Sequence, residues 1–474
     1  MQYKNAVERF LQRPWLISLL LLTVGAGVYT GAFFGAFQYD DGFAILLNPH
    51  LDRADIFAGH LDHIVRPVLH ITFLLDRSFY GHHPAGYHLL NLLLHLSSGL
   101  LVYRVLSRAV TGKSRHIPFW AALLFLIHPI QTEAVTYISG RASELMAFFY
   151  LLAFLLYVKT SDPTGHGVTG RLLIPGAMAF LLLSLGSKET AMTFPLALLL
   201  WDVLIRRLNG AALRATFLSA HLPFWLIVLA AAVWAWRHPR YSVLAQFSLE
   251  VRPLWDNLLS ELHAVTYALR LFFFPWEQNF DHDLPTMHSL FQWPLPLDLV
   301  VLGGLATLGL IMARRVPLLS FGLGWFFVHL LPTSLIPRAD LMSERNLYLA
   351  SIGLILAVVV LVFLFLQRLT VAVPYSRTGR VAGYSLALPA VLVLSLLTYQ
   401  RNLLYRDEVS LWSDTVRKSP AKARPHNNLG HAYAMQGEWE EAIEEFRIAA
   451  RLDPDYALAK KNLRDAYLHQ VGRQ

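Results

Sequence analysis

Uninterrupted apolar runs, long enough to cross a lipid bilayer, recur along most of this 474-residue chain. About 20 consecutive apolar residues in a helix span the roughly 30 Å hydrocarbon core of a membrane. The composition agrees, because 55% of the residues are hydrophobic and only 15% are charged, too few for the surface of a soluble protein of this length. The runs are continuous, whereas the strands of a transmembrane barrel alternate apolar and polar residues. The sequence therefore predicts an all-α, multi-pass membrane protein in contact with membrane lipid.

We expect about 11–13 spans: eleven apolar blocks are expected to cross the membrane, and the crossing of a further block is open. The first block, from Pro14 to Phe37, is too long for the core of a cleaved signal peptide, so we expect it to be retained. The open case, 257–275, carries His263 and Arg270 and either crosses, re-enters or lies along the interface. The other ten blocks lie near residues 86–103, 117–131, 142–158, 172–187, 190–205, 215–236, 298–313, 317–336, 347–366 and 382–399.

Basic residues are concentrated in the loops on one side of these spans. They include Arg104, Arg108, Arg206, Arg207, Arg214, Arg314 and Arg315. The positive-inside rule assigns that side to the cytoplasm, provided that 257–275 does not cross completely. The opposite, extracytoplasmic side then receives the segments YDDGFAILLNPH, HPIQTEAVTYISGR, SLGSKET and PRADLMSERN and the C-terminal tail. We expect a functional site there, because only this side combines acids with His, Lys and Arg.

The C-terminal tail has a charged, helix-forming composition and repeats one pattern of residues. Leu429 and Leu463 are one period apart, and so are Tyr433 and Tyr467. The segment NNLGHAYAMQGEWEEAIEEFRIAARLDP fits the tetratricopeptide pattern, in which each unit is a pair of antiparallel helices. One unit is complete and is flanked by two half units. We therefore divide the chain into a membrane domain, 1–402, and a repeat domain, 403–474, which either binds a peptide in its groove or acts as a structural cap or oligomerisation patch.

Two adjacent carboxylates, Asp40 and Asp41, directly follow the first span. Successive loop residues point in different directions, so the pair is not expected to share one proton. One could accept a proton from a hydroxyl while the other orients that hydroxyl or binds a cation. The alternative is a structural role, as a helix-end pair or an N-cap for the segment GFAILL. Glu133, in the next loop on this side, is a candidate second acid across a shared cavity.

Cationic side chains are predicted at the same membrane boundary. Arg141 and Arg345 each begin a span, and Lys188 follows the end of another. Each could hold an anionic group, although Lys188 could instead pair with Glu189. Fixed cations at this depth suit an anionic lipid head group, and nearby acids suit a nucleophile that must lose a proton. The residues that we expect to support them are Arg66, His88, His128, Glu189 and Glu344.

A metal ligand set is not defined by the sequence. His88, Asn91 and His95 share one face of the second span, because their spacings are three and four residues. Two histidines without a carboxylate form an incomplete metal site, so hydrogen bonding inside the bundle is the expected role. The chain has no cysteine, which excludes disulfides, a thiolate nucleophile and Cys-ligated metals.

Taken in order, these motifs resemble the transmembrane and tetratricopeptide-repeat protein family, which belongs to the GT-C superfamily of membrane glycosyltransferases. The resemblance lies in YDDGFAILLNPHL, RPVLHITFLLDRSFYGHHPAGYHLLNLLLH, LFLIHPIQTEAVTYISGRASEL, GSKET and SERNLYLASIG, followed by the repeats. It covers nearly the whole chain. Eukaryotic members carry many repeats and this chain has barely two, in the style of a short bacterial member. The resemblance implies a GT-C-type membrane bundle, in a bacterial inner membrane, followed by a short α-solenoid.

The resemblance also implies an enzyme that moves a sugar, often mannose, from a polyprenyl-phosphate carrier to a serine or threonine hydroxyl of a protein or peptide, with no nucleic acid as partner. GT-C enzymes carry a catalytic acid in the first external loop, which matches Asp40 and Asp41. Asp40 would take the proton in an inverting displacement while Asp41 orients the hydroxyl. The leaving phosphate needs no general acid, only stabilisation of its charge, for which Lys188, Arg141 and Arg345 are the candidates. A divalent cation could supply part of that stabilisation.

Three other functions are compatible with these residues. The sugar could go to a lipid or glycan instead of a protein. A non-catalytic scaffold could recruit partners through the repeats, although this would favour a longer repeat array. A transporter or flippase would need polar residues at mid-membrane, where these spans are apolar apart from the face that carries His88 and His95.

Overall fold

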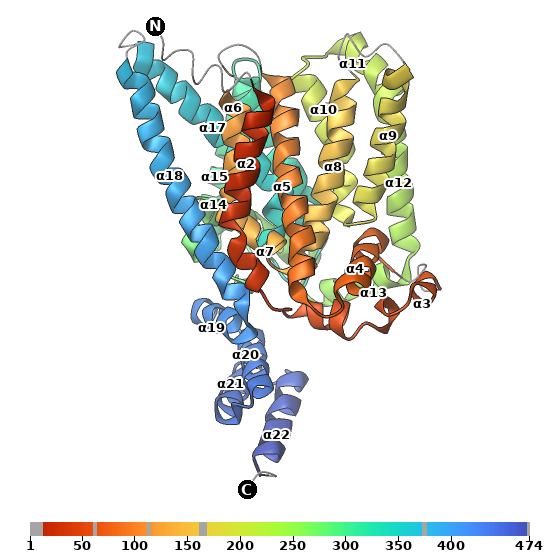
Figure 1. The fold of residues 1–474 in the computed structure, drawn as a ribbon, viewed down its shortest axis with the longest axis vertical. Coiled ribbons are helices and arrows are strands. Elements are labelled where there is room, and N and C mark those ends of the chain that lie inside the picture. The colour runs from red at the N-terminus through yellow and green to blue at the C-terminus, as the bar shows by residue number, and fades with distance from the viewer. Residues whose placement is uncertain are drawn as a thin grey trace.

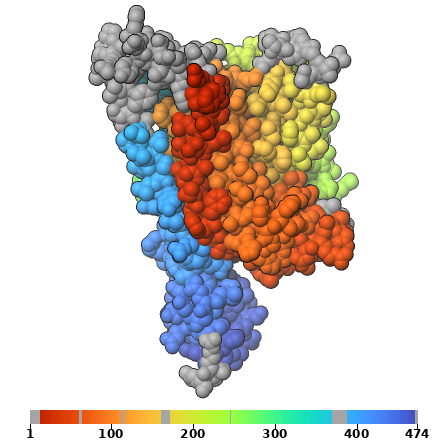
Figure 2. Space-filling view, in the orientation of Figure 1, coloured from red at the N-terminus to blue at the C-terminus, as the bar shows by residue number. Residues whose placement is uncertain are grey.

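The computed structural model describes residues 13–59, 64–110, 114, 116–160, 168–371 and 377–471. Within these ranges every regular element is a helix, which confirms the predicted all-α class. Figure 1 shows a bundle of long helices and a smaller set of tail helices that extends from one end of it. The space-filling view shows the tail as a narrow projection beneath the broad bundle (Figure 2).

Each of the eleven predicted blocks coincides with a helix of the bundle. These are α2 (Pro14–Val28), α5 (Pro84–Ala109), α6 (Ile117–Ile127), α8 (Arg141–Lys159), α9 (Val168–Leu185), α10 (Phe194–Leu204), α12 (Leu222–Arg237), α15 (Leu295–Met312), α16 (Pro317–Leu335), α17 (Leu347–Val371) and α18 (Arg377–Leu403). Among the described residues, seven helical stretches are long and apolar enough to cross a membrane, and Ile117–Ile127 and Leu172–Leu185 are apolar but shorter. The chain is therefore a multi-pass membrane protein.

The helices α16 and α17 pack against each other very closely at two glycines. A Cβ on Gly322 would lie 2.6 Å from the carbonyl oxygen of Gly353, and a Cβ on Gly353 would lie 2.2 Å from that of Gly322. Small residues allow this approach, and van der Waals packing drives helix association where lipid removes most of the hydrophobic effect. The crossing fixes the position of α17, whose preceding turn carries residues of the site.

The block at 257–275 forms α14 (Leu254–Phe273), which begins and ends on the same side of the bundle. Just before α14, Arg252 donates a hydrogen bond to the Arg338 carbonyl (2.5 Å). Just after it, Gln278 donates one to the Glu344 carboxylate (2.8 Å). Both partners belong to the loop that joins α16 to α17, so α14 does not cross. The question that the sequence left open is answered by these contacts.

Short helices cover the end of the bundle that carries the tail. They are α3 (Ala54–Ala58), α4 (Pro67–Tyr80), α7 (Thr132–Val135) and α13 (Pro239–Val251), whereas α11 (Gly210–Thr216) lies at the opposite end (Figure 1). The helix α4 is amphipathic, with Ile71, Leu75 and Phe79 exposed at helical spacing. An exposed apolar face on a helix at the end of a membrane bundle is typical of an element that lies in the lipid interface.

Four antiparallel helices form the tail, as the repeated pattern predicted. They are α19 (Glu408–Lys418), α20 (Ala423–Gln436), α21 (Trp439–Leu452) and α22 (Ala457–Val471). The α20–α21 turn needs Gly437, which adopts the left-handed conformation at φ 83° and ends α20. Gly430 allows the two helices to pack closely, because a Cβ there would lie 2.8 Å from the Phe446 ring.

Candidate functional site

Most residues singled out by the sequence analysis lie at the end of the bundle from which the tail extends. They come from segments far apart in the chain: the loop after α2, the short helix α7, the turn η8 (Glu189–Thr193) after α9 and the turn η11 (Glu344–Asn346) before α17. Polar residues are retained at the ends of spans because the hydrocarbon core makes them costly deeper in the bilayer. The site is therefore made of short loops that rigid helices hold in place.

Asp41 is a structural clamp within this site. It is fully buried, and its carboxylate accepts hydrogen bonds from the Gln38 N–H (2.9 Å), the Ser139 N–H (2.8 Å) and the Ser139 hydroxyl. Burial raises the pKa of Asp41 to about 7, against the opposing effect of these hydrogen bonds. The clamp ties the loop after α2 to the start of α8. This geometry does not suit the orienting role expected for Asp41, because its oxygens already have partners inside the protein.

Asp40 has a different environment from its neighbour. It is half-buried, and its backbone N–H donates to the Tyr137 hydroxyl (3.1 Å). The same hydroxyl lies near the Asp40 carboxylate. Burial, reinforced by the charges of Asp41 and Asp40, raises the pKa of Tyr137 well above its ordinary value. The Arg345 guanidinium lies over the Tyr137 ring, 5.4 Å from its centroid, so Asp40, Tyr137 and Arg345 are in contact in series.

Glu133 holds Arg345 by its backbone and its side chain. The buried Glu133 carboxylate accepts hydrogen bonds from the Ser343 hydroxyl (2.8 Å) and the Arg345 N–H (3.1 Å). It also faces the Arg345 Nε at 3.5 Å. A glycine is required at position 140 beside it, because a Cβ there would lie 2.3 Å from the Glu133 carbonyl oxygen. Glu133 is therefore brought together with Arg345, as a partner of the cation.

Lys188 lies close to the turn that carries Arg345. Its ammonium group is buried and donates to the Ser143 hydroxyl and to the Asn346 side-chain oxygen, both at 2.8 Å. Burial, followed by the repulsion of Arg338 and Arg66, lowers the pKa of Lys188 well below its ordinary value. Lys188 and Arg345 line one small pocket, together with Met146, Thr190, His329, Asn346 and Leu349. Two of the expected phosphate ligands thus share one pocket.

Glu189 forms a half-buried ion-pair group with two arginines. Its carboxylate lies 3.0 Å from Arg66 and 3.4 Å from Arg338. Burial by itself would raise the pKa of Glu189, but Arg66 and Arg338 outweigh it and lower the pKa to about 2. The basic side chains of Lys188, Arg66 and Arg338 thus surround this single carboxylate. The sequence analysis did not select Arg338, although it lies in the same motif, PRADLMSERN, as Glu344 and Arg345.

A groove adjoins the pocket of Lys188 and Arg345. It runs between α14 and α16 and passes under the loop that carries Arg338. Its apolar wall includes Ala264, Val265, Ala268, Leu330, Met342 and Leu347. Its polar lining consists of Arg338, Ser343 and Asn346 together with Thr333, Ser334 and the acids Glu261 and Asp340, and Asn346 lines the pocket as well. The groove therefore joins an apolar surface to the cationic part of the site.

Arg141 has a structural position, contrary to the phosphate contact expected for it. The side chain is completely buried and forms an ion pair with Asp76 of α4 at 2.6 Å. It also donates to Asn91 (2.6 Å), Thr72 (3.1 Å) and the Tyr87 carbonyl (2.9 Å). These partners use the guanidinium donors within the protein. Arg141 therefore holds the interfacial helix α4 against α5 and α8.

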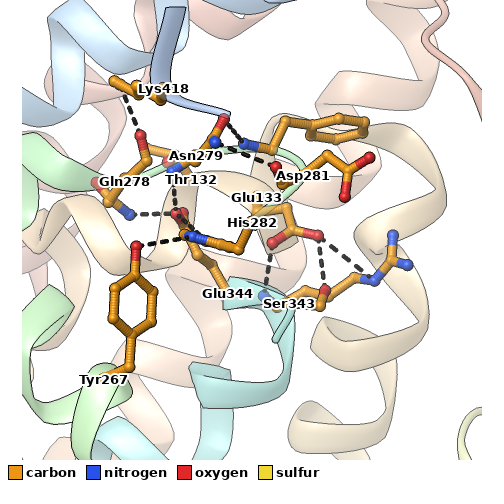
Figure 3. A network of polar contacts seen from close by, with 12 residues as sticks. Thr132, Glu133, Tyr267, Gln278, Asn279, Asp281, His282, Ser343, Glu344 and Lys418 are labelled. Carbon is orange, nitrogen blue, oxygen red and sulfur yellow. Dashed lines mark hydrogen bonds and ion pairs between the residues drawn. The ribbon is translucent and has the colours of Figure 1, made fainter. Parts of the chain in front are cut away.

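Glu344 is the centre of a buried polar network that the sequence did not predict (Figure 3). Its carboxylate accepts hydrogen bonds from the Gln278 side chain (2.8 Å) and the Asn279 N–H (2.7 Å). The His282 ring, which also contacts the Tyr267 hydroxyl, lies 3.2 Å from the same carboxylate. Glu344 thus fixes the loop that follows α14. These partners are distant from Glu344 in the sequence, so no local pattern could have identified them.

His88 and His128 both hydrogen-bond to backbone carbonyls. His88 Nε2 lies 3.1 Å from the Gly35 oxygen, at the start of the loop that carries Asp40. His128 Nε2 lies 3.1 Å from the Phe272 oxygen, and its ring stacks on the Phe272 ring. His95 similarly contacts the Leu126 oxygen at 3.1 Å and the Tyr348 hydroxyl at 2.9 Å. These histidines join helices and loops, which is the role that their spacing favoured.

The residues near Asp40 do not fit a divalent cation. In the part of the chain that the structure describes, no group of three or more His, Cys, Asp or Glu side chains is arranged to hold a metal ion. The two nearest acids are committed, because Asp41 accepts three hydrogen bonds and Glu133 is paired with Arg345. A cation site needs carboxylate or carbonyl oxygens that are free to coordinate it. We therefore derive no step through a metal.

Comparison with known sequences shows what the chain is similar to. A family model described as "Tetratricopeptide repeat" matches residues 423–456. The chain is 25% identical to "Protein O-mannosyl-transferase F38B6.6" of Caenorhabditis elegans, over 92% of this chain and 63% of that protein. It is 29% identical to "Protein O-mannosyl-transferase Tmtc3" of Drosophila melanogaster (82% and 48% covered) and 26% identical to "Protein O-mannosyl-transferase TMTC3" of Homo sapiens (94% and 52% covered). These matches confirm the resemblance that the motifs indicated.

The chain spans about half to two thirds of the length of these relatives. Among solved structures, it is similar to the Archaeoglobus fulgidus oligosaccharyltransferase tethered with an acceptor peptide, with a TM-score of 0.47 and 13% identity over 83% of this chain and 56% of that one. It is also similar to ArnT from Cupriavidus metallidurans bound to undecaprenyl phosphate, with a TM-score of 0.45 and 14% identity over 86% and 80% of the two chains.

Proposed function

We propose that this protein transfers a hexose, with mannose as the first candidate, from a polyprenyl-phosphate carrier to a hydroxyl group of a protein acceptor. The relatives that match most of this chain are named protein O-mannosyl-transferases. These relatives are longer than this chain, so we argue its activity from its own site. The site combines a half-buried acid, a cluster of cations and an apolar groove at the end of a membrane bundle.

The observation that carries the proposal is the position of Arg345 between the acidic and the cationic parts of the site. On one side its guanidinium lies over Tyr137, whose hydroxyl contacts Asp40. On the other side Arg345 lines a pocket together with Lys188. A sugar phosphate held by Lys188 and Arg345 would therefore place its sugar toward Asp40. An inverting transfer needs leaving group and base on opposite sides of the reacting carbon, and in this proposal Lys188 with Arg345 and Asp40 take those two places.

In the proposed reaction the acceptor oxygen attacks the anomeric carbon while the bond from that carbon to the phosphate oxygen breaks. Asp40 accepts the proton of the attacking hydroxyl, and Tyr137 holds the chain at Asp40 by accepting a hydrogen bond from its backbone N–H. The electron pair of the breaking bond goes to the phosphate, which leaves with an added negative charge. Lys188, which is buried, and Arg345 stabilise that charge as fixed donors beside the leaving phosphate. No general acid is required, in contrast to glycoside hydrolysis.

The groove between α14 and α16 is the proposed path of the lipid carrier. Its apolar wall would contact the polyprenyl chain, and Arg338 in its polar lining would meet the phosphate before the Lys188 pocket does. The surplus of basic side chains around Glu189 favours a phosphate that carries one or two negative charges. We place this face outside the cytoplasm because the basic loops lie at the opposite end of the spans. The bacterial inner membrane is proposed only from the resemblance to a short bacterial member of the family.

The experiment is a transfer assay with the purified full-length chain in liposomes. The donor is polyprenyl-phosphate mannose, with polyprenyl-phosphate glucose in parallel, the acceptor is a peptide rich in serine and threonine, and mass spectrometry detects the product. We expect transfer by the wild type and a loss of ~100-fold or more in Asp40→Asn, which removes the base. The matched control is Asp55→Asn, an exposed acid of α3 that pairs with Arg53.

Undiminished transfer by Asp40→Asn would overturn the catalytic role of Asp40. Sugar found only on lipid or glycan would mean that the protein is a sugar transferase whose acceptor is a lipid or glycan and not a protein. A wild type that moves no sugar from either donor would favour a scaffold that acts through its repeats.

A further inference from the structure

The loop that carries Asp40 is attached to the tail as well as to the bundle. The backbone N–H of Ala36 and the side-chain amide of Gln38 both donate to the carbonyl oxygen of Tyr405, at 3.1 Å each. Tyr405 lies directly before α19, the first helix of the tail. Residues from two ends of the chain are thus joined next to the proposed base.

Tyr39, the residue before Asp40, has a backbone conformation that needs external support. Its φ is 45°, in the left-handed region that bulky side chains rarely adopt. Such a conformation persists only where surrounding contacts determine it, and it is common at functional sites. The direction of the Asp40 carboxylate follows from it, because a change at Tyr39 would rotate the next residue.

The support for Tyr39 comes largely from α19. The Tyr39 ring packs edge-on against Trp412, with centroids 5.5 Å apart, and against Phe280 at 6.1 Å. Trp412 and Phe280 are themselves in contact at 5.3 Å. The Glu408 carboxylate, in the first turn of α19, lies near the backbone N–H of Tyr39. Aromatic pairs of this geometry favour one fixed arrangement of the rings.

The helix α19 is in turn anchored firmly to the bundle. Asp414 forms a buried ion pair with Arg401 of α18 at 3.0 Å. Lys418 donates to the Gln278 carbonyl at 2.6 Å, in the loop that Glu344 fixes (Figure 3). Trp412 lies in the same short helix as these two anchors and is almost completely buried. The bundle therefore fixes the position of Trp412 relative to Asp40.

We propose that Trp412 and Glu408 are positioning residues, through which the first tail helix holds Tyr39 in the left-handed conformation and so directs Asp40 toward the reacting hydroxyl. The proposal rests on the proposed function, in which Asp40 is the base. It gives the start of the tail a role in the chemical step, separate from any peptide that the repeat groove binds.

The first test is hydrogen exchange, which does not depend on activity. In the full-length protein, we expect Trp412→Ala to accelerate amide exchange in peptides that cover residues 36–41. Trp412→Phe retains an aromatic edge and should leave exchange close to that of the wild type. The matched control is Trp439→Ala in α21, where the ring stacks on His469, away from Asp40. Unchanged exchange in Trp412→Ala would overturn the proposal.

The second test is the kinetic effect in the transfer assay. Trp412→Ala should lower kcat about tenfold while the KM for the donor stays within about twofold, because Trp412 contacts none of the phosphate ligands. Trp412→Phe should recover most of the lost kcat, and Trp439→Ala should retain wild-type values. A rise in KM with unchanged kcat would contradict positioning and would indicate a binding role for the tail.

A second variant keeps the proposal testable if Trp412→Ala does not fold. Glu408→Ala removes a carboxylate that lies near the Tyr39 N–H at the start of α19 and should lower kcat about threefold or more while speeding exchange at Tyr39. Wild-type behaviour in both readouts would overturn the proposal. Faster exchange in a protein whose wild type transfers no sugar would reject the proposed function and leave the contact between tail and loop in place.

Discussion

The ammonium group of Lys188 lies 2.8 Å from the side-chain oxygen of Asn346, the residue that follows Arg345. Through this contact the end of α9 is joined to the start of α17, and two cations that are far apart in the sequence line one pocket. The role of each residue in this part of the site can be tested by substituting it singly.

Replacing Lys188 by methionine should reduce the rate of sugar transfer by ~100-fold or more, because the side-chain nitrogen that would donate to the leaving phosphate is lost. The variant should fold, since methionine fills the same buried space and leaves only Ser143 and Asn346 to find new partners. The measurement is single-turnover transfer in liposomes. Arg270→Gln is the control, because Arg270 is an exposed cation paired with Glu277. Equal losses in both variants would show a general effect of charge and contradict a specific role for Lys188.

Replacing Arg141 by methionine should affect stability and leave donor binding unchanged. The substitution leaves the buried Asp76 carboxylate without its partner, which typically costs about 3–5 kcal/mol. We expect a lower Tm in detergent, with the donor KM of the folded fraction near that of the wild type. The double variant Asp76→Asn, Arg141→Met should be less destabilised than the sum of its single changes. A raised donor KM together with a wild-type Tm would contradict this structural role and support the contact between Arg141 and the phosphate that the sequence predicted.

Thermal stability should fall at acid pH because of Glu189. Its folded pKa, about 2, is below that of the unfolded chain, so its contribution to stability is present above about pH 4.5 and is lost as the pH falls toward 2. Glu189→Gln should remove this contribution at every pH and lower stability at neutral pH by up to about 3 kcal/mol, because Arg66 and Arg338 lose their partner. Tm measured from pH 3 to 7 tests this. Parallel curves for the two proteins would contradict it.

Asp41 should have the opposite dependence on pH. Its folded pKa of about 7 is above the unfolded value, so its contribution is full below about pH 4 and is lost as the pH rises through 7. The wild type should therefore lose more stability between pH 5 and 8 than Asp41→Asn, whose side chain stays neutral. Scanning calorimetry at these two pH values decides the point. Equal losses of stability in the two proteins would contradict this prediction and would mean that Asp41 stays ionised between pH 5 and 8.

Much of the fold was predictable because continuous apolar runs fix the length and position of membrane helices. The repeats were predictable for a similar reason, since their period is local in the sequence. The position of α14 was not predictable, because its direction depends on contacts of Arg252 and Gln278 with a loop that is distant from both in the sequence.

The site was predictable only in part. Asp40 and Asp41 are adjacent in the sequence, and what separates their roles is Ser139, which lies 98 residues from Asp41. Arg141 and Arg345 both precede a span, and they differ because Asp76 faces one of them and the Lys188 pocket adjoins the other. Arg338 was missed because nothing local distinguishes it from an ordinary loop arginine. These differences arise from tertiary pairing, which residue spacing does not report.

The central claim, that donor phosphate, cations and base meet in one place, is tested most directly by a structure of the Asp40→Asn variant with a polyprenyl-phosphate sugar bound. We expect the phosphate oxygens within hydrogen-bond distance of Lys188 and Arg345, the lipid chain in the groove beside α14, and the anomeric carbon facing position 40. A donor bound elsewhere, with its phosphate away from Lys188 and its sugar away from position 40, would contradict the claim.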